Sequence, residues 1–401
     1  MTRRPRVGLA VAEDLHDYGL SRHLSENYAA AFRRLGWEAA AETLRPDDPR
    51  PLRRLLAPGT DLLFTHGGRL MAPGGPLGDG IGAALRAADK PVLMLLADPP
   101  FSPWLPPILD RLPPRTAAFA IDPGFLPGLP AALAAPYLPC AHLLDGHGPA
   151  ATQDKDIPLL FVGALGDPDA VWRQVPQADK PAFRALTEAA SAQPDRPLAE
   201  LAATVLPACG HAAEAGAAAI RDLLHRADLF LRSRRRLAFA RRVLRHPAVL
   251  VANIDAGLPD MHPEARILPA QPFPAMLALL RRARTAAICQ PNYPGALNER
   301  IVFAMQARCV AIATANPRTR QLFAEGREIL FAGPEGEDLD EAVAAAQDAE
   351  GIRDAAATRV AADFTPDGNL RAMLAAMASA RLLDPGLAVA GGPRMTVPPL
   401  F

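Results

Sequence analysis

Apolar residues in the first third of the chain gather in short continuous runs, with stretches of helical spacing between them. The runs at 7–12, 37–44, 61–64, 91–97, 116–121 and 135–138 have the length of strands, and helical spacing occupies 24–35, 51–56 and 81–88. Short apolar runs bounded by turn residues are typical of strands buried in a parallel sheet. Their alternation with helices predicts an α/β fold with a doubly wound parallel sheet.

The same alternation returns in the second half of the chain. Strand-type runs lie at 157–163, 248–254, 267–268, 285–289, 309–313 and 329–331, and helical stretches at 273–283, 318–324, 339–346, 352–362 and 369–382. Residues 170–245 contain no convincing strand and predict several helices, which is long for one crossover. We interpret 170–245 as a helical insert in a second sheet domain.

The end of this insert is strongly basic, because residues 232–245 read RSRRRLAFARRVLR. A charge run of this kind is usually the solvated face of a helix. We therefore predict that its arginines point outward while its apolar residues pack inward, namely Leu237, Ala240, Val243 and Leu244.

A polar stretch with glycine and proline at 145–156 separates the two predicted sheets. We predict an N-terminal domain at 1–150 and a C-terminal domain at 151–383, because 401 residues suffice for two cores of ordinary size. The 384–401 segment is rich in proline and glycine and is predicted to be a loosely held extension.

The amino-acid composition limits which binding partners and which cellular compartment we expect. The formal net charge is zero, which argues against nucleic acid as the main partner, because that ligand needs a basic face. The four cysteines form no CxxC pair and no zinc-type spacing with histidine. Three of them lie in apolar stretches, where we expect buried thiols, and we expect a reducing compartment. No apolar run approaches ~18 residues, and the one near the N-terminus is too short for a signal peptide. We expect a cytoplasmic protein without a transmembrane segment.

Candidate chemistry gathers at residues 290–331. A loop with two prolines and a glycine at 291–295 precedes Asn298, which lies where a helix N-cap belongs, with Glu299 and Arg300 in the first turn. This pattern places a helix N-terminus at the carboxyl edge of a parallel sheet, where such sheets bind phosphates. Arg300 would add a guanidinium that grips two phosphate oxygens. The alternative is that Asn298 and Glu299 only cap the helix and that Arg300 is solvated.

The stretch resembles the donor-binding half of GT-B glycosyltransferases, in the CgeB-like branch often assigned to glycosyltransferase family 1. The shared positions are Pro291, Asn292, Gly295, Asn298, Glu299, Arg300, Ala304, Met305, Asn316, Pro317, Phe323, Gly326, Glu328 and Ile329. Shorter similarities occur at 98–101, 138–141 and 155–163, and in the Arg232–Arg236 run followed by the strand at 248–254. The arginine- and alanine-rich composition is typical of a GC-rich genome, and we expect a bacterial protein.

The resemblance implies two Rossmann-like domains that face a cleft, with a nucleotide-diphosphate sugar bound by the second. It implies a metal-independent glycosyltransferase, without a cofactor, that moves the sugar to a hydroxyl of a glycan, a protein or a small molecule. The implied donor-binding residues are Gly163, Asp255, Asn292, Asn298, Glu299 and Arg300.

An acceptor hydroxyl also needs a general base in this scheme. His66 follows a predicted strand of the first domain and has a pKa suited to proton transfer. Asp98 follows the next strand, and it is either a base or the cap of a turn before Pro99. Asp14, His142 and His147 are weaker candidates.

Three departures from the family pattern keep other functions open. The positions of its paired acidic residues hold Gly295 and Phe303, and the glycine after its helix is Arg308, which would crowd a close backbone approach. One alternative is therefore a non-catalytic relative that binds a nucleotide or glycan or serves as a partner subunit. Another is an epimerase that isomerises a sugar nucleotide without an acceptor.

Overall fold

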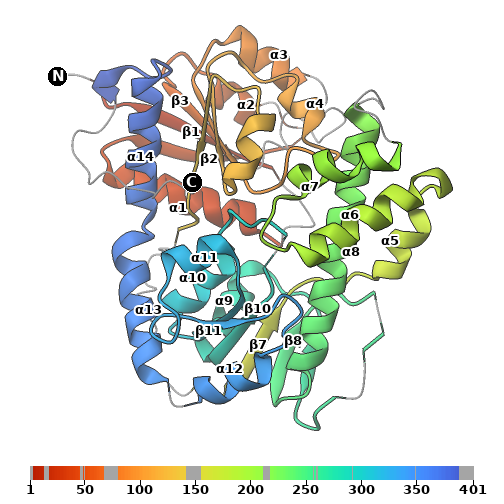
Figure 1. Cartoon of the computed structure of the whole chain (residues 1–401). Helices are drawn as coiled ribbons and strands as arrows, with labels where there is room; N and C mark the ends of the chain where they lie inside the picture. The colour runs from red at the N-terminus through yellow and green to blue at the C-terminus, as the bar shows by residue number, and fades with distance from the viewer. Residues whose placement is uncertain are drawn as a thin grey trace. The chain divides into compact units, whose positions relative to one another are not determined.

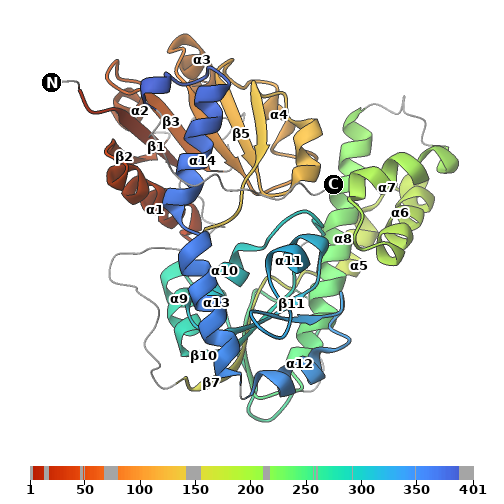
Figure 2. The same cartoon turned by 60° about the vertical axis from the view of Figure 1, so that its left-hand side comes forward.

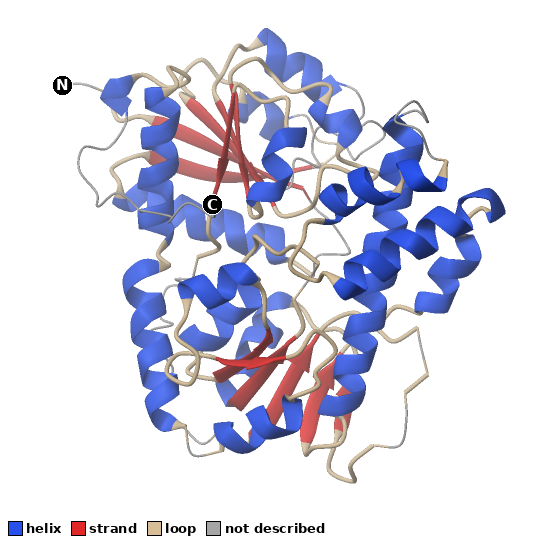
Figure 3. Cartoon of the chain, viewed as in Figure 1, coloured by secondary structure: helices blue, strands red, loops and turns tan. Residues whose placement is uncertain are grey.

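The computed structural model describes residues 3–12, 18–45, 48, 50–66, 80–140, 155–210, 217–255, 257–258, 261–290, 292–347 and 349–387. The chain divides into two compact units, Met1–Gly146 with Asp363–Phe401 and His147–Ala362. Each unit contains one six-stranded sheet, in which every pair of neighbouring strands is parallel (Figures 1 and 3). The predicted α/β class is therefore confirmed.

The sheet of the first unit has the order β2-β1-β3-β4-β5-β6. Its core strands are the apolar runs of the sequence, and every residue of β4 and β5 is buried. The strands are β1 (Arg6–Ala12), β2 (Glu38–Leu44), β3 (Leu62–His66), β4 (Val92–Leu96), β5 (Thr116–Ala120) and β6 (Leu133–Pro136). The helices are α1 (Leu20–Arg34), α2 (Arg50–Leu55), α3 (Gly80–Ala87), α4 (Pro106–Leu109) and α14 (Pro366–Ser379).

Helix α1 packs on this sheet through two buried aromatic residues. The ring centroid of Phe64 on β3 lies 4.8 Å from that of Tyr28 and 6.2 Å from that of Phe32. Burying an aromatic side chain of this kind stabilises a fold by roughly 1.5–3 kcal/mol. The helix ends before Gly36, which has a φ of 87° and supplies the left-handed stop that the sequence predicted.

Helix α14 belongs to the first unit, whereas we predicted residues 151–383 as one domain. Its Asp367 pairs with Arg34 of α1 at 2.9 Å, and the amide of Asn369 donates to the carbonyl of Leu138. These partners are more than 200 residues away in sequence, so helical spacing alone could not assign the helix to a sheet. The predicted linker and extension lie mostly outside the described residues.

The sheet of the second unit has the order β12-β11-β10-β7-β8-β9. Numbered from its first strand, this is the 3-2-1-4-5-6 order of a Rossmann sheet, in which the strand order reverses between β7 and β10. The strands are β7 (Ile157–Val162), β8 (Ala248–Val251), β9 (Arg266–Leu268), β10 (Ala283–Ile288), β11 (Val310–Thr314) and β12 (Leu330–Ala332). The short strand β9 lies at the edge, as predicted.

The predicted insert is helical throughout its described part. Figure 2 shows α5, α6 and α7 gathered beside the long helix α8. These helices are α5 (Pro168–Gln174), α6 (Lys180–Ala192), α7 (Leu198–Val205) and α8 (Ala217–Val243). The remaining helices are α9 (Phe273–Arg282), α10 (Glu299–Gln306), α11 (Pro317–Leu322), α12 (Leu339–Ala346) and α13 (Glu350–Asp363).

Two further predictions concern the cysteines and membrane-spanning segments. All four cysteines are free, and Cys140, Cys289 and Cys309 are buried, as expected for small apolar core residues. Within the described ranges, no helix is both long and apolar enough to cross a membrane.

Arg308 occupies the helix-stop position after α10 and has a φ of 56°, in the left-handed region. We predicted a crowded backbone approach there, whereas the structure shows that the backbone angle is the reason why a glycine suits this position. The Arg308 side chain turns outward and forms an ion pair with Asp354 on α13.

In a helix interior, alanine gives a more stable protein than glycine. The left-handed backbone at position 308 predicts the opposite order of stability there. Both substitutions remove the ion pair with Asp354, but only alanine keeps a Cβ in the left-handed region. We expect Arg308→Gly to be more stable than Arg308→Ala by about 1 kcal/mol in urea unfolding. Asp354 gives the matched control, because Asp354→Ala and Asp354→Gly remove the same ion pair but change a residue inside α13. There the alanine variant should be more stable than the glycine variant.

Candidate functional site

The candidate site lies at the carboxyl edge of the second sheet, where the strand order reverses between β7 and β10. Open α/β sheets bind ligands at this point, because the loops after the two strands diverge there. Gly163 follows β7, and residues 289–298 lead from β10 to α10. The site is therefore built from these two loops and from the helix that packs beside them.

The loop from β10 to α10 is fixed by buried amides. Asn316, which caps α11, donates its Nδ2 to the carbonyls of Ala296 at 2.8 Å and Tyr293 at 3.2 Å. The Nε2 of Gln290 donates to the carbonyl of Thr314. Leaving a buried donor without an acceptor costs free energy, so these hydrogen bonds hold the loop in one conformation.

A buried carboxylate ties the same loop to α8. Asp228 is 1% exposed and forms an ion pair with Arg232, one helical turn further on. Asn292 Nδ2 donates to Asp228 Oδ1 at 3.2 Å, and the Tyr293 hydroxyl lies 3.5 Å from Oδ2. Arg235 completes the contact, because its Nη1 donates to Asn292 Oδ1 at 2.6 Å. We call Asp228, Arg232, Arg235, Asn292 and Tyr293 the α8–loop cluster.

The inward direction of Arg235 corrects our prediction for the basic run. Arg235 is 8% exposed, and its Nη2 donates to the carbonyl of Ala190 at 3.0 Å. The apolar residues of the run are buried as predicted, at Leu237, Ala240, Val243 and Leu244. The charge-run rule failed because one face of α8 meets the β10–α10 loop and the other insert helices instead of solvent.

The guanidinium groups of Arg236 and Arg300 lie near that of Arg232, a member of the cluster. Burial, together with the charges of Arg232 and Arg300, lowers the pKa of Arg236 to about 10. Arg300 donates its Nη1 to the carbonyl of Val162, the last residue of β7, at 2.9 Å. Its side chain therefore bridges from α10 to the end of the neighbouring strand, across the point where the strand order reverses.

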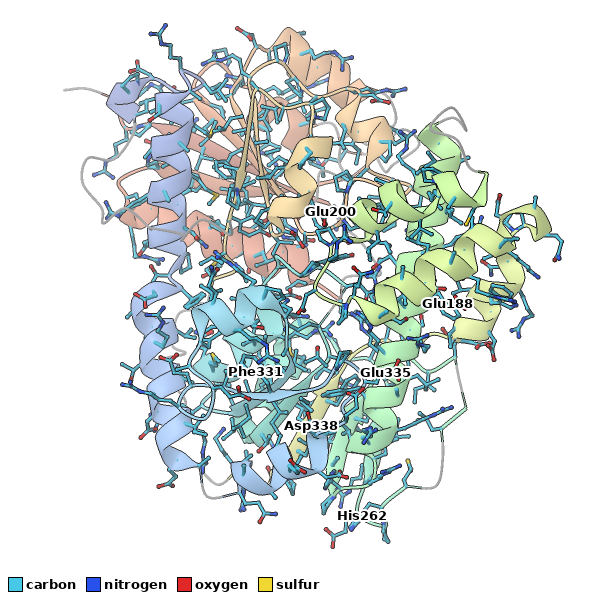
Figure 4. The ribbon with its side chains drawn as sticks, viewed as in Figure 1. Glu188, Glu200, His262, Phe331, Glu335 and Asp338 are labelled. Carbon is cyan, nitrogen blue, oxygen red and sulfur yellow. The ribbon has the colours of Figure 1, made fainter. Side chains whose placement is uncertain are left out.

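The positive charge of this group is only partly balanced. Arg232 is neutralised by Asp228, and Arg234 nearby on α8 pairs with Glu335, labelled in Figure 4, at 3.1 Å. Among the residues that the structure describes, no acidic side chain pairs with Arg236 or Arg300, and the buried Nε of Arg236 has no hydrogen-bond acceptor. A buried charge without a partner is costly, so the arrangement suits an anionic ligand.

The predicted cap at Asn298 is confirmed. Its Oδ1 accepts from the N–H of Arg300 at 2.9 Å, and its own carbonyl accepts from the N–H of Ile301. In the described structure, the N–H of Glu299 and the Nδ2 of Asn298 have no partner. These two donors are left for a ligand at the N-terminus of α10, and the half-buried Glu299 carboxylate also has no described partner.

The other predicted donor-binding residues lie on the same sheet edge. A Cβ at Gly163 would be 3.2 Å from the Phe161 ring and 3.7 Å from Arg300 Nη1, so glycine leaves room beside the guanidinium. Asp255 is exposed beyond β8, where its N–H donates to the carbonyl of Leu165 at 3.0 Å. Asn292 is held within the α8–loop cluster.

The two predicted bases lie in the first unit. His66 ends β3 and Asp98 follows β4, and because these strands are parallel neighbours both residues lie at the carboxyl edge of one sheet. Both are half-buried. Asp14, His142 and His147 lie outside the described residues.

Sequence reasoning missed Asp228 and Arg236 as site residues. They lie eight positions apart, with Arg232 midway, so all three share one helix face. This spacing within a basic run is the signal that could have revealed them. Phe303, at the second acidic position of the family pattern, is 2% exposed and packs on Phe273 at 5.5 Å, so it belongs to the core.

Comparison with known proteins concerns the fold. The chain resembles the HepE protein of Anabaena, solved with UDP-glucose, with a TM-score of 0.53 and 11% identity over 94% of this chain and 100% of that one. It also resembles sucrose-phosphate synthase of Thermosynechococcus elongatus, with a TM-score of 0.51 and 12% identity over 94% and 98% of the two chains. A search of curated protein sequences found no match.

These likenesses and the two Rossmann-like sheets define the fold as GT-B. Residues 184–375 match the model of the family described as Glycosyl transferase-like. That span contains α8, the β10–α10 loop and all three guanidinium groups, and the match supports a transferase.

Proposed function

We propose that the second unit binds a nucleotide-diphosphate sugar and that the protein transfers the sugar to an acceptor hydroxyl. The observation that carries the proposal is the pair Arg236 and Arg300, two guanidinium groups without a described acidic partner where the strand order reverses. A diphosphate would neutralise both, and its oxygens would also meet the N–H of Glu299 and the Nδ2 of Asn298. Gly163 gives the ligand room beside Arg300.

The chemistry follows from where charge develops. The bond between the sugar carbon C1 and the diphosphate oxygen breaks, and the acceptor oxygen forms a new bond to C1. The electron pair leaves on the diphosphate, and positioned guanidinium groups stabilise that charge, so we propose transfer without a metal ion. The acceptor proton goes to a base, for which His66 and Asp98 remain our candidates.

The alternative is a relative that binds a nucleotide sugar without transferring it. Gly295 and Phe303 favour this alternative, since neither can hold a sugar or ribose hydroxyl through a carboxylate, and Phe303 lies in the core. Binding with neither transfer nor hydrolysis would support it, whereas isomerisation of the sugar would indicate an epimerase. The CgeB-like branch, the bacterial origin and a cytoplasmic location remain predictions.

The first test is a thermal-shift screen with UDP, ADP, GDP and dTDP sugars, beginning with UDP-glucose, which the HepE structure contains. A ligand at about a hundred times its Kd adds roughly 2.7 kcal/mol to the stability of the folded form. Arg300→Ala should weaken binding about ten- to a hundredfold, because it removes a charged hydrogen bond to phosphate. It should cost only about 1 kcal/mol of stability, for the bond to Val162.

Arg284 provides the matched control for Arg300. It also donates one side-chain hydrogen bond to a backbone carbonyl, that of Lys155 at 2.9 Å, but near the amino end of β10. Arg284→Ala should therefore leave nucleotide binding unchanged. Equal binding by the wild type and Arg300→Ala would show that the donor site is elsewhere.

A further inference from the structure

The side chain of Gln290 lies at the carboxyl edge of the second sheet, just after β10, and is 5% exposed. The backbone N–H of Gln290 donates to the Oγ1 of Thr314, the last residue of β11, at 2.8 Å. Because β10 and β11 are parallel neighbours, the helices that follow them, α10 and α11, begin at the same edge. Gln290 therefore lies where two helix N-termini meet the sheet.

The Gln290 amide contacts the caps of both helices. Its Oε1 accepts from the N–H of Asn298, the N-cap of α10, at 3.4 Å. The same Oε1 accepts from Nδ2 of Asn316, the N-cap of α11, at 3.4 Å. Its Nε2 donates to the carbonyl of Thr314 and, at 3.3 Å, to the Oγ1 of Thr319. Both hydrogens and both lone pairs of the amide are therefore used.

The direction of this amide is fixed by its partners. A peptide N–H only donates and a peptide carbonyl only accepts, so Oε1 must face Asn298 and Nε2 must face Thr314. An ionised glutamate could not donate to the carbonyl, and methionine has no donor and only a weak acceptor. Position 290 therefore needs a side chain that accepts and donates at the same time.

The bond to Gln290 also completes the hydrogen bonding at the start of α10, where four N–H groups have no acceptor within the helix. Asn298 accepts from the N–H of Arg300 through Oδ1 and from that of Ile301 through its carbonyl. The N–H of Asn298 itself is the third, and it donates to Gln290. Of the four groups, the N–H of Glu299 alone has no acceptor among the described residues.

We propose that Gln290 is a positioning residue of the donor site. It fixes the Asn298 cap against α11, and with the cap it fixes the two donors that would meet the diphosphate, the Glu299 N–H and the Asn298 Nδ2. This inference rests on the donor site proposed above. Gln290 acts through Asn298 and not on the ligand, because donors that are already held in place need less ordering when the ligand binds.

Gln290→Met tests this role, because it keeps the length of the side chain and removes the hydrogen bonds of the amide. The probes are UDP and inorganic pyrophosphate, measured by calorimetry on the full chain. Pyrophosphate makes the result independent of base and sugar. We expect both probes to bind about tenfold more weakly than to the wild type, since the cap loses its attachment to α11.

Thr319→Val is the matched control. Thr319 is buried, and its Oγ1 accepts from the Gln290 amide and donates to Asn316 Oδ1 at 2.9 Å, so this variant also loses buried hydrogen bonds. The bond from Asn298 to Gln290 remains. Binding should therefore stay within about twofold of the wild type, while urea unfolding shows a loss of stability. Equal weakening in both variants would reduce Gln290 to a residue of general stability.

Gln290→Glu gives a pH profile that a loss of packing would not give. When protonated, the introduced carboxyl donates to the Thr314 carbonyl and accepts from the N–H of Asn298, as the amide does. All partners of the amide are neutral, so burial raises the pKa of the carboxyl above its ordinary value of about 4.3. It ionises as the pH rises, and it then cannot donate.

The affinity of Gln290→Glu for pyrophosphate, divided by that of the wild type, should therefore fall about tenfold between about pH 5 and about pH 8. The ratio cancels the titration of the ligand itself, and circular dichroism checks that the variant is folded at both pH values. A ratio that does not change with pH would contradict the assigned role of the amide. This variant also keeps the test open if Gln290→Met does not fold.

The wild-type protein separates a failure of this inference from a failure of the donor site. If it binds neither UDP nor pyrophosphate nor any nucleotide sugar of the earlier screen, the donor site is wrong and the role of Gln290 falls with it. If the wild type and Gln290→Met bind the probes equally well, the donor site stands and Gln290 does not position it.

Discussion

Replacing Asp228 by alanine is expected to lower the free energy of unfolding by about 3–5 kcal/mol. Asp228 is 1% exposed and is the shared acceptor for Arg232, Asn292 and Tyr293. Its removal leaves the Arg232 charge, whose side chain is 22% exposed, without its acid. The loss should appear as a lower urea midpoint in circular dichroism, to which α8 contributes.

Asp222 on the same helix is the control for Asp228→Ala. It pairs with Arg226 at 2.7 Å in the same i,i+4 geometry, but its side chain is 51% exposed. Asp222→Ala should cost less than about 1 kcal/mol, because water replaces the lost partner. Equal losses from the two variants would mean that the α8–loop cluster does not stabilise the unit.

The same substitution should also weaken nucleotide binding. The cluster holds Asn292 and Tyr293, which belong to the loop that leads to Asn298. Without Asp228, the loop loses a fixed attachment to α8, and the donors at the N-terminus of α10 are less well placed. The cluster thus links the helical insert to the site, which gives the insert a role in binding as well as in packing.

The elements of the fold could be predicted because their signals are local. The strands β4, β5 and β11 are continuous apolar runs in which every residue is buried, and the Asn298 cap follows from residue type and position. The long strandless stretch likewise marked the helical insert. In each case the determining residues lie within a few positions of one another.

The contacts that complete the site could not be predicted, because their partners are distant in sequence. Asn292 meets Asp228 across 64 positions and Arg235 across 57. Within the basic run of α8, individual arginines have different surroundings. Arg235 is buried and donates hydrogen bonds to two acceptors, whereas Arg241 is exposed. The charge run predicts the same solvent exposure for every arginine in it. Tertiary packing then determines whether each side chain is buried or exposed.

Replacing Arg236 by methionine is expected to weaken binding of the nucleotide sugar about a hundredfold without lowering stability. The side chain is half-buried, and its Nε has no acceptor among the described residues. In the free protein it is also repelled by Arg232 and Arg300, so methionine of similar length removes an unfavourable charge. Calorimetry gives the affinity, and urea unfolding should show equal or higher stability than the wild type.

Arg241→Met is the matched substitution, because Arg241 lies on the same helix and is exposed, with one long contact of 3.4 Å to the carbonyl of Gly257. It should change neither binding nor stability. The double variant Arg236→Met with Arg300→Ala adds a sharper criterion. If both residues bind one diphosphate, the combined loss should differ from the sum of the single losses by more than about 0.5 kcal/mol, since both contacts depend on the same ligand group. Strict additivity would place the two arginines in separate sites, and a stability loss in Arg236→Met would make its role structural.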